Sequence, residues 1–489
     1  MSDAIVPPPP KWRPFAWAAG AVVVVILVSV GVVILVHTAM SCGQGVSWHG
    51  SPKECTGVTD GSAPPFSPDL TEIEHAIRDE NAAVAADGDY VSVVLMIPMT
   101  LRGDGTDDIT SSWIRHHLEG AHLAQLSHNA STSKPHMRLL LANAGSALRQ
   151  WSTTVDQIDQ LRDKEHIVAV TGIGLSVDGA EQAIQRLQEI QMPIIASILT
   201  ADDVGGSDGF LRISPTNFED GRAAATYVTS KMQRAVLVRD TKPADHYTST
   251  LADAFLDSLK EVPNFPVTTR EYNSMNGRVA NTFSYMRPNV CGPKPDAVFF
   301  AGRGRDAIDF IRELSNNPCE GRPQMTILTG VDMALFAKPD DNLIAHARDS
   351  GISVVYTGLT HPDAWLGNED GEFSQTAIDQ FDNSCPVKVC YQQLSKDGLE
   401  DDSAIVSYDA VLTATEAIHK ASGSGIESVQ AEDIRAVLGQ LQEKQAFHGA
   451  TGILSFDFAG NPQNKAIPML QLIPQQPPKF LQLVKPGPH

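Results

Sequence analysis

The chain has 489 residues, of which 42% are hydrophobic and 19% are charged. This composition is typical of a globular protein with about two or three domain-sized units, and it excludes a disordered chain. The formal net charge of −21 argues against binding to nucleic acid or to an anionic membrane surface.

The chain begins with a proline-rich tail, residues 1–14, which precedes an apolar run from Phe15 to Val36. The run contains no charged residue, and a stretch of about 20 apolar residues spans a bilayer as one helix. Many of its residues are β-branched, but in lipid a helix satisfies every backbone polar group within the segment. We therefore expect a transmembrane helix over residues 15–36; a buried helix of a soluble protein is the alternative.

Charges beside the run indicate its orientation. Lys11 and Arg13 precede it, so the positive-inside rule places the tail in the cytoplasm and the long C-terminal part outside the cell membrane. A cleaved signal peptide is one alternative, but its apolar region is normally about 7–15 residues long. A lipoprotein anchored at Cys42 is another, although the residues before Cys42 match a lipobox poorly. An uncleaved, single-pass signal-anchor is the interpretation that we prefer.

All six cysteines follow the apolar run. An even number of cysteines outside the cytoplasm indicates disulfide bonds rather than free thiols. Proximity in the sequence suggests the pairs Cys42–Cys55, Cys291–Cys319 and Cys385–Cys390. A zinc site is the alternative, but the sequence has no Cys-x-x-Cys pair.

Residues 37–87 are rich in Gly, Ser and Pro, and we interpret them as an extracytoplasmic tether with a short helix near residues 71–86. From Asp89 onward, short runs that are apolar on both faces alternate with amphipathic helical stretches. The runs 90–97, 136–141, 167–171 and 194–196 begin this series. Such alternation predicts parallel sheets covered by helices, and about 400 residues of it predict two α/β lobes.

Ligands of parallel α/β sheets bind at the carboxyl ends of the strands. Residues 171–176, Thr-Gly-Ile-Gly-Leu-Ser, follow one predicted strand and precede a helix. Glycines allow backbone N–H groups to face an anion, and Ser176 adds a hydroxyl group. A plain strand–helix turn is the alternative interpretation of this loop.

Seven segments of the chain carry a resemblance to a known family. They are YVSVVLMIPMT (90–100), AVTGIGLS (169–176), MPIIASILTADDV (192–204), FLRISPTNFEDGRAAATYV (210–228), HYTSTLADAF (246–255), VSYDAVLTATEAI (406–418) and FHGATGILSFDFAGN (447–461). In order and spacing they resemble the motifs of the type I periplasmic binding proteins, which include the branched-chain amino-acid binding proteins of ABC importers. The match runs from about residue 88 to 485.

The resemblance implies a fold of two parallel-sheet lobes joined by three crossovers, placed near Ser214, Val355–Thr357 and Thr451. Lobe one would comprise residues 88–213 and 357–450, and lobe two residues 214–355 and 452–489, within one domain from 88 to 489. The ligand would bind in the cleft between the lobes, which close on it.

Site residues follow from the resemblance position by position. Ser176 is similar to the serine that binds the ligand carboxylate, Tyr247 to the tyrosine that covers the ligand, and Asp332 to the acid that pairs with its ammonium group. The segment with Ser197, Leu199 and Thr200 is similar to one that binds both groups. Arg303 stands where the family has an aromatic residue; it could bind a second anionic group or face solvent.

No other motif predicts chemistry. His116, His117, His122 and His128 lack the spacing of metal ligands, and we find no set of nucleophile, base and oxyanion donors, no dinucleotide loop and no cofactor motif. We therefore expect a non-enzymatic, membrane-anchored solute-binding protein that presents an amino acid or similar small polar molecule to an ABC permease. A sensing module that acts through another membrane partner is the alternative.

Overall fold

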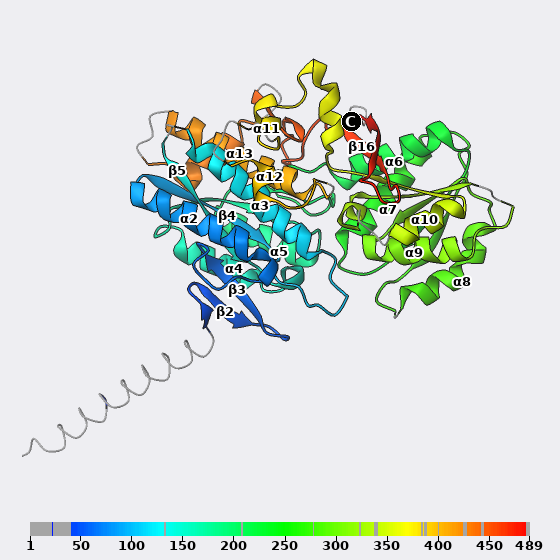
Figure 1. Cartoon of the computed structure of the whole chain (residues 1–489), viewed down its shortest axis with the longest axis horizontal. Helices are drawn as coiled ribbons and strands as arrows, with labels where there is room; N and C mark the ends of the chain where they lie inside the picture. The colour runs from blue at the N-terminus through cyan, green and yellow to red at the C-terminus, as the bar shows by residue number, and fades with distance from the viewer. Residues whose placement is uncertain are drawn as a thin grey trace, which may run out of the picture.

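In the computed structural model the chain forms two α/β lobes that lie side by side (Figure 1). The structure describes residues 22, 41–131, 134–206, 209–276, 278–321, 324–336, 341–382, 385, 389–399, 401–423, 428–441 and 445–485. Each lobe is built on its own sheet, and the predicted α/β architecture with two parallel-sheet lobes is confirmed.

The predicted membrane helix Phe15–Val36 and the tail before it lie outside the described residues, apart from Val22. Within the described ranges, no helix combines the length and the apolar character that crossing a bilayer requires. The membrane anchor therefore stays a prediction.

Lobe one contains an eight-stranded sheet with the order β1-β2-β3-β5-β4-β6-β7-β8. Its strands are β1 (Ser41–Gly43), β2 (Val46–His49), β3 (Glu54–Thr59), β4 (Tyr90–Ile97), β5 (His136–Asn143), β6 (Ile167–Gly172), β7 (Ile194–Ala196) and β8 (Phe210–Arg212). Strands β4 to β8 are parallel, and β1 to β3 form an antiparallel edge. Strand β4 is buried almost throughout, because helices cover both faces of the sheet.

The helices of lobe one come from two separate stretches of the chain, residues 68–189 and 362–438. They are η1 (Pro68–Leu70), α2 (Thr71–Asp87), α3 (Ser111–Asn129), η2 (Ser146–Leu148), α4 (Trp151–Leu161), α5 (Asp178–Glu189), η4 (Pro362–Asp370), α11 (Gln375–Asp379), α12 (Tyr391–Leu394), α13 (Ser403–Gly423) and α14 (Ala431–Leu438). Helices α3 and α13 pack closely, because Gly120 lets the two backbones approach: a Cβ there would collide with the carbonyl group of Ala404.

Lobe two contains a seven-stranded sheet with the order β10-β9-β11-β12-β13-β16-β17. Its strands are β9 (Ala235–Asp240), β10 (Val267–Tyr272), β11 (Ala297–Ala301), β12 (Met325–Thr329), β13 (Ile352–Thr357), β16 (Ile467–Gln471) and β17 (Lys479–Val484). Its helices are α6 (Asn217–Lys231), α7 (His246–Lys260), α8 (Val279–Cys291), α9 (Gly304–Asn316), η3 (Val331–Phe336) and α10 (Asp341–Asp349). A two-stranded sheet, β14 (Phe447–Gly449) and β15 (Gly452–Leu454), precedes β16.

The chain passes between the two sheets three times: after β8, after β13, and between β15 and β16. Helix α6 packs against α7 of lobe two, whereas α13 returns to lobe one and contacts α3 and β6. The carboxyl ends of β6 and β7 therefore face those of β11 and β12 across the boundary between the lobes. The residue limits that we assigned to each lobe stay a prediction.

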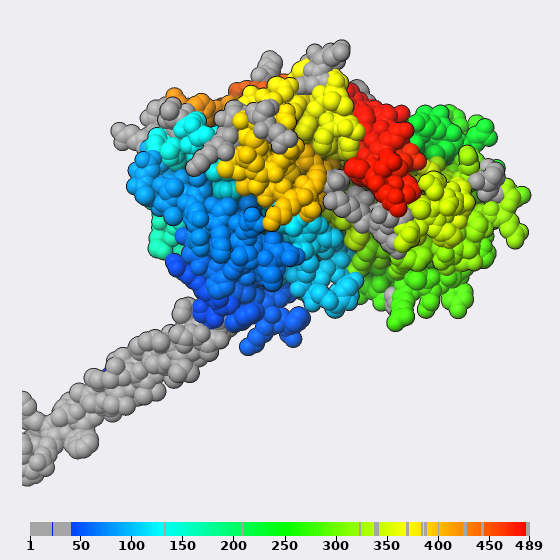
Figure 2. Space-filling view, in the orientation of Figure 1, coloured from blue at the N-terminus to red at the C-terminus, as the bar shows by residue number. Residues whose placement is uncertain are grey.

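The tether interpretation of residues 37–87 is wrong for its described part, residues 41–87, which belongs to lobe one (Figure 2). Strand β3 pairs with β5, and helix α2 covers the sheet, where Asn81 bonds both the N–H (2.8 Å) and the C=O (2.7 Å) of Leu139 on β5. Seven apolar side chains of this segment are buried: Val46, Val58, Ala63, Leu70, Ile73, Ile77 and Val84. Burial of these side chains, together with the pairing of β3 with β5, fixes the segment in place.

The three predicted disulfide bonds are confirmed. Cys42 is bonded to Cys55, Cys291 to Cys319, and Cys385 to Cys390. The first ties β1 to β3, and the second ties the end of α8 to the segment after α9. No described cysteine is free.

Candidate ligand-binding cleft

A cleft between the lobes brings together five of the seven predicted site residues. Ser176 and Thr200 line it from lobe one, and Tyr247, Arg303 and Asp332 line it from lobe two. Each follows the carboxyl end of a strand or begins the helix after one, which is where parallel sheets present binding groups.

On the lobe-one side, Ser176 is held by the loop that follows β7. Its Oγ accepts the backbone N–H of Thr200 (3.2 Å) and of Ala201 (3.1 Å), which leaves its own hydroxyl proton to donate. Trp113, which sequence reasoning missed, also lines the cleft and packs under Gly174, where a Cβ would lie 2.6 Å from the indole ring. This side of the cleft therefore combines an aromatic surface with hydroxyl donors.

Ser197 and Leu199 are not among the residues that line the cleft. Ser197 Oγ lies 3.3 Å from the carbonyl oxygen of Gly172 and 3.3 Å from His117 Nε2. The carbonyl oxygen of Leu199 accepts hydrogen bonds from Arg212 (3.0 Å) and from a neighbouring serine (3.2 Å). In this structure both residues support the loop rather than contact the cleft, and their roles in binding stay predictions.

On the lobe-two side, Tyr247 and Asp332 are joined by a hydrogen bond. The Tyr247 hydroxyl accepts the backbone N–H of Asp332 (3.2 Å), and Asp332 Oδ2 accepts the N–H of Gly304 (2.7 Å). Gly330 is required here, because a Cβ would collide with the Tyr247 hydroxyl. Burial raises the pKa of Asp332 to about 6, although Arg303 and the Gly304 N–H oppose that rise.

Arg303 does not face solvent, which excludes one of the two interpretations of this residue. It is 3% exposed, and its Nε and Nη2 donate to the two oxygens of Asp245 at 3.0 and 2.8 Å. Nη1 reaches Asp332 Oδ1 at 3.4 Å, and the guanidinium lies 4.9 Å from the ring centroid of Tyr247. Arg303 thus forms ion pairs with Asp245 and Asp332 inside the cleft, and Asp245 is its main partner.

The charges of this group stabilise one another. Burial opposes the charge on Arg303, but Asp245 and Asp332 outweigh it and raise the pKa of the guanidinium. Burial would likewise raise the pKa of Asp245, yet Arg303 and Lys242 hold it below its usual range. Three of the five guanidinium N–H groups donate to these acids, so one N–H on Nη1 and one on Nη2 have no acceptor among the described residues.

Asp402 lines the cleft near the crossover that follows β13. Its Oδ2 accepts the N–H of Leu359 (2.8 Å), whereas its buried Oδ1 has no hydrogen-bond partner among the described residues. Burial raises the pKa of Asp402 well above its usual range. No sequence signal pointed to this residue, because Asp401-Asp402 resembled an ordinary pair of loop charges.

The cleft is narrow in this structure. Its volume of 30 Å³ is close to that of a single water molecule, because side chains of both lobes fill it. A wider cavity of 740 Å³ adjoins it and shares the side chains of Ile109 and Leu175. A ligand of amino-acid size therefore requires the lobes to separate before it reaches Ser176.

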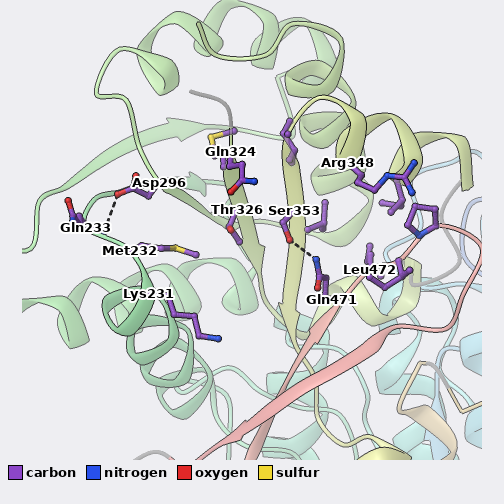
Figure 3. Close-up of a pocket in the computed structure, with 17 residues that line it drawn as sticks. Lys231, Met232, Gln233, Asp296, Gln324, Thr326, Arg348, Ser353, Gln471 and Leu472 are labelled. Atoms are coloured by element: carbon purple, nitrogen blue, oxygen red, sulfur yellow. Dashed lines mark hydrogen bonds between the residues drawn. The ribbon is translucent and has the colours of Figure 1, made fainter. Parts of the chain in front are cut away.

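A further cavity, of 760 Å³, lies elsewhere (Figure 3). It lies at the amino ends of β9, β11, β12 and β13 in lobe two, and its polar residues bond one another, as in the pairs Gln233–Asp296 and Ser353–Gln471. Only lobe two contributes to it. It therefore lacks the carboxyl-end position and the two-lobe lining of the cleft.

The four histidines of α3 form no metal site; no described cluster of His, Cys, Asp or Glu has the arrangement of metal ligands. Instead they bond separate partners: His116 bonds Asp401 (2.6 Å), His117 the carbonyl oxygen of Trp113 (3.1 Å), His122 Gln125 (2.8 Å) and His128 the carbonyl oxygen of Pro135 (3.0 Å). The contacts of His116 and His128 tie α3 into lobe one, whereas these bonds of His117 and His122 lie within the helix.

Solved structures resemble the whole two-lobed unit, although no protein-family model and no curated protein matches the sequence. A leucine-binding protein LivK of Thermotoga maritima is 17% identical with a TM-score of 0.60, over 81% of this chain and 99% of that one. The branched-chain amino-acid binding protein LivJ of Streptococcus pneumoniae, in complex with isoleucine, is 17% identical with a TM-score of 0.60. This match covers 81% of this chain and 100% of that one. A solute-binding protein of an ABC transporter from R. palustris, in complex with benzoate, is 16% identical with a TM-score of 0.59. This match covers 81% of this chain and 97% of that one. The chain has the fold of the type I periplasmic binding proteins.

Proposed function

We propose that this chain is the substrate-binding component of an ABC-type importer, without enzymatic activity of its own. One observation carries the proposal: Ser176 and Thr200 of lobe one and Tyr247, Arg303 and Asp332 of lobe two converge on one cleft at the carboxyl ends of both sheets. A small molecule that contacts both lobes would favour the closed form, which a permease could recognise.

The ligand in this proposal is a small carboxylate-bearing molecule, an amino acid or a related organic acid. The Ser176 hydroxyl and the two remaining N–H groups of Arg303 are donors suited to a carboxylate. Structural neighbours of the chain bind isoleucine in one case and benzoate in another. The apolar run at residues 15–36 would hold the domain at the outer face of the cell membrane.

Calorimetric titration of the full chain in lipid nanodiscs tests the proposal. Leucine, isoleucine, benzoate and 4-hydroxybenzoate form the first panel, and we expect saturable heat with at least one of them. Ser176→Ala and Tyr247→Ala should weaken that binding at least about tenfold, since each removes a contact in the cleft. Ser422→Ala, near the end of α13, is the matched control. Absence of saturable heat with every compound would count against the proposal.

A further inference from the structure

The wider cavity beside the cleft, which we call the outer-mouth cavity, is lined by both lobes. Lobe one contributes residues 100–102, 106–109, 147–149, 151, 175, 177–179 and 182, and lobe two contributes residues 242–244, 274, 275 and 305. Its volume of 740 Å³ lies within the range of small-molecule sites, about 300–1,000 Å³. It has room for a molecule much larger than an amino acid.

Four basic side chains meet in this cavity: Arg102 and Arg149 from lobe one, and Lys242 and Arg305 from lobe two. Across the whole chain acidic residues outnumber basic ones, 58 to 37, so such a gathering is unusual. Basic side chains that line a concave surface attract anions, and the attraction is strongest at low ionic strength.

Each of the three acidic side chains of the cavity lies beside a hydrogen-bond donor or a cation, although the buried Oδ1 of Asp108 has no hydrogen-bond partner among the described residues. Both oxygens of Asp107 accept backbone N–H groups of its own loop, at 3.1 and 3.0 Å. Asp108 lies 3.6 Å from Lys242 Nζ and 3.4 Å from Arg305 Nη2, which joins the lobes. Asp178 lies 3.0 Å from the ring of the histidine that begins α7. None of the three acids pairs with the arginines of lobe one.

Arg102 and Arg149 form no salt bridge with a described carboxylate, although the pKa of Asp104 is lowered by hydrogen bonds from Thr106 and, to a lesser extent, by the charge of Arg102. Arg102 Nη1 donates to Thr106 Oγ1 at 3.2 Å, but its buried Nε has no hydrogen-bond partner in the described chain. Arg149 is exposed at the cavity wall. The Nε is closed off from solvent, so an anionic group in the cavity would bond Arg102 through its Nη atoms and would bond the exposed guanidinium of Arg149.

Apolar side chains line the same cavity. Leu101, Leu148, Trp151 and Met275 contribute, and Met275 is 67% exposed. The cavity therefore offers charge-assisted hydrogen bonds to an acidic group together with an apolar wall for the rest of a ligand.

We propose that the outer-mouth cavity binds an organic anion whose apolar body is larger than an amino-acid side chain, with its acidic group held by Arg102 and Arg149. This inference rests on one part of the proposed function, namely that a ligand enters the protein between the two lobes. Contacts to Met275 and Lys242 from the other lobe would make the bound anion favour lobe closure.

A fluorescence or calorimetric titration of the full chain in nanodiscs with 1-naphthoate tests this inference. We expect saturable binding that weakens as salt is added, and at least about tenfold weaker binding of the neutral analogue 1-naphthamide. The double variant Arg102→Gln with Arg149→Gln should bind 1-naphthoate at least about tenfold more weakly, because both charged donors are lost.

Lys164→Gln is the matched control, because this lysine of lobe one is 76% exposed and outside the cavity. Absence of 1-naphthoate binding, equal affinity for the naphthamide, or unchanged affinity in the double variant would each overturn the inference. Benzoate or leucine binding that survives in the double variant would leave the proposed function standing, so the two failures are distinguishable. Circular dichroism of every variant confirms folding before titration.

Discussion

Replacement of Arg303 by methionine tests the ion-paired group inside the cleft. Methionine keeps an unbranched apolar side chain but removes the guanidinium, so Asp245 and Asp332 lose the cation between them. Both acids are buried, at 2% and 8% exposure, and neither can turn to water without opening the lobes. We therefore expect Arg303→Met to lower the free energy of unfolding substantially.

The contacts of Arg303 allow the size of that loss to be worked out. Two short hydrogen bonds to Asp245 and one longer bond to Asp332 disappear, and a hydrogen bond to a charged group contributes about 1.5–3 kcal/mol. Lys242 Nζ, 3.3 Å from Asp245, and the Gly304 N–H, 2.7 Å from Asp332, remain and limit the damage. The expected loss is therefore about 3 kcal/mol, the lower end of the range for breaking a buried ion pair.

The loss should depend on pH. In the native chain the pKa of Asp245 is below its usual range, so its contribution to stability is present above pH ~4 and is lost as the pH falls. Without Arg303 the pKa of both acids rises, and the folded variant takes up protons that neutralise them. The stability deficit should accordingly be larger at pH 8 than at pH 5.

Urea unfolding of the full chain in nanodiscs, followed by tryptophan fluorescence at both pH values, measures the effect. Arg348→Met is the matched control, because Arg348 pairs with Asp349 at the surface, where the two side chains are 65% and 66% exposed. We expect no measurable change in the control. If Arg303→Met were as stable as the control, or if its deficit were equal at both pH values, the assignment of Arg303 as a buried, ion-paired residue would be refuted.

Three further predictions concern the scaffold. A chain that begins at residue 88 should be insoluble, because it lacks β1 to β3 and α2. A chain that begins at residue 41 keeps these elements and should purify as a monodisperse protein. Size-exclusion chromatography of the two chains compares them. Replacing Cys291 and Cys319 by alanine should cost about 3–4 kcal/mol in urea unfolding, as expected for a separation of 28 residues. Burial raises the pKa of Asp220 to about 7, so stability is lost as the pH rises from about 4 to 7. In the Asp220→Asn variant the free energy of unfolding should vary less with pH between about 4 and 7. The same slope in the variant and the native chain would contradict this prediction.

The parallel strands were predictable because their burial is visible in the sequence. Tyr90–Ile97 and Ile167–Gly172 lie between covering helices, so both of their faces are apolar and they read as continuous runs. Strands β1 to β3 gave no such signal, because they are three to six residues long and contain Gly and Ser at the sheet edge. Their pairing depends on β5, which lies more than 75 residues further along the chain.

The candidate site was predictable only in part, for a similar reason. Ser176, Tyr247 and Asp332 stand in local motifs, and the structure brings them to one cleft. The burial of Arg303 depends on Asp245, which is 58 residues away in the sequence and reads there as an ordinary helix cap. Asp402 is equally inconspicuous without the fold that buries it. Charges that face each other across a cleft leave no periodic signal in a single sequence.

Arg303 also bears on which ligands the cleft accepts. The ammonium group of an amino acid would have to compete with a guanidinium that already holds Asp245 and Asp332, and it would approach a like charge. A ligand without that group has no such competition and can use the two remaining N–H groups of Arg303. Under both proposals the cleft and the outer-mouth cavity would favour the same charge, and we expect an organic acid to bind more tightly than the amino acid of matching shape.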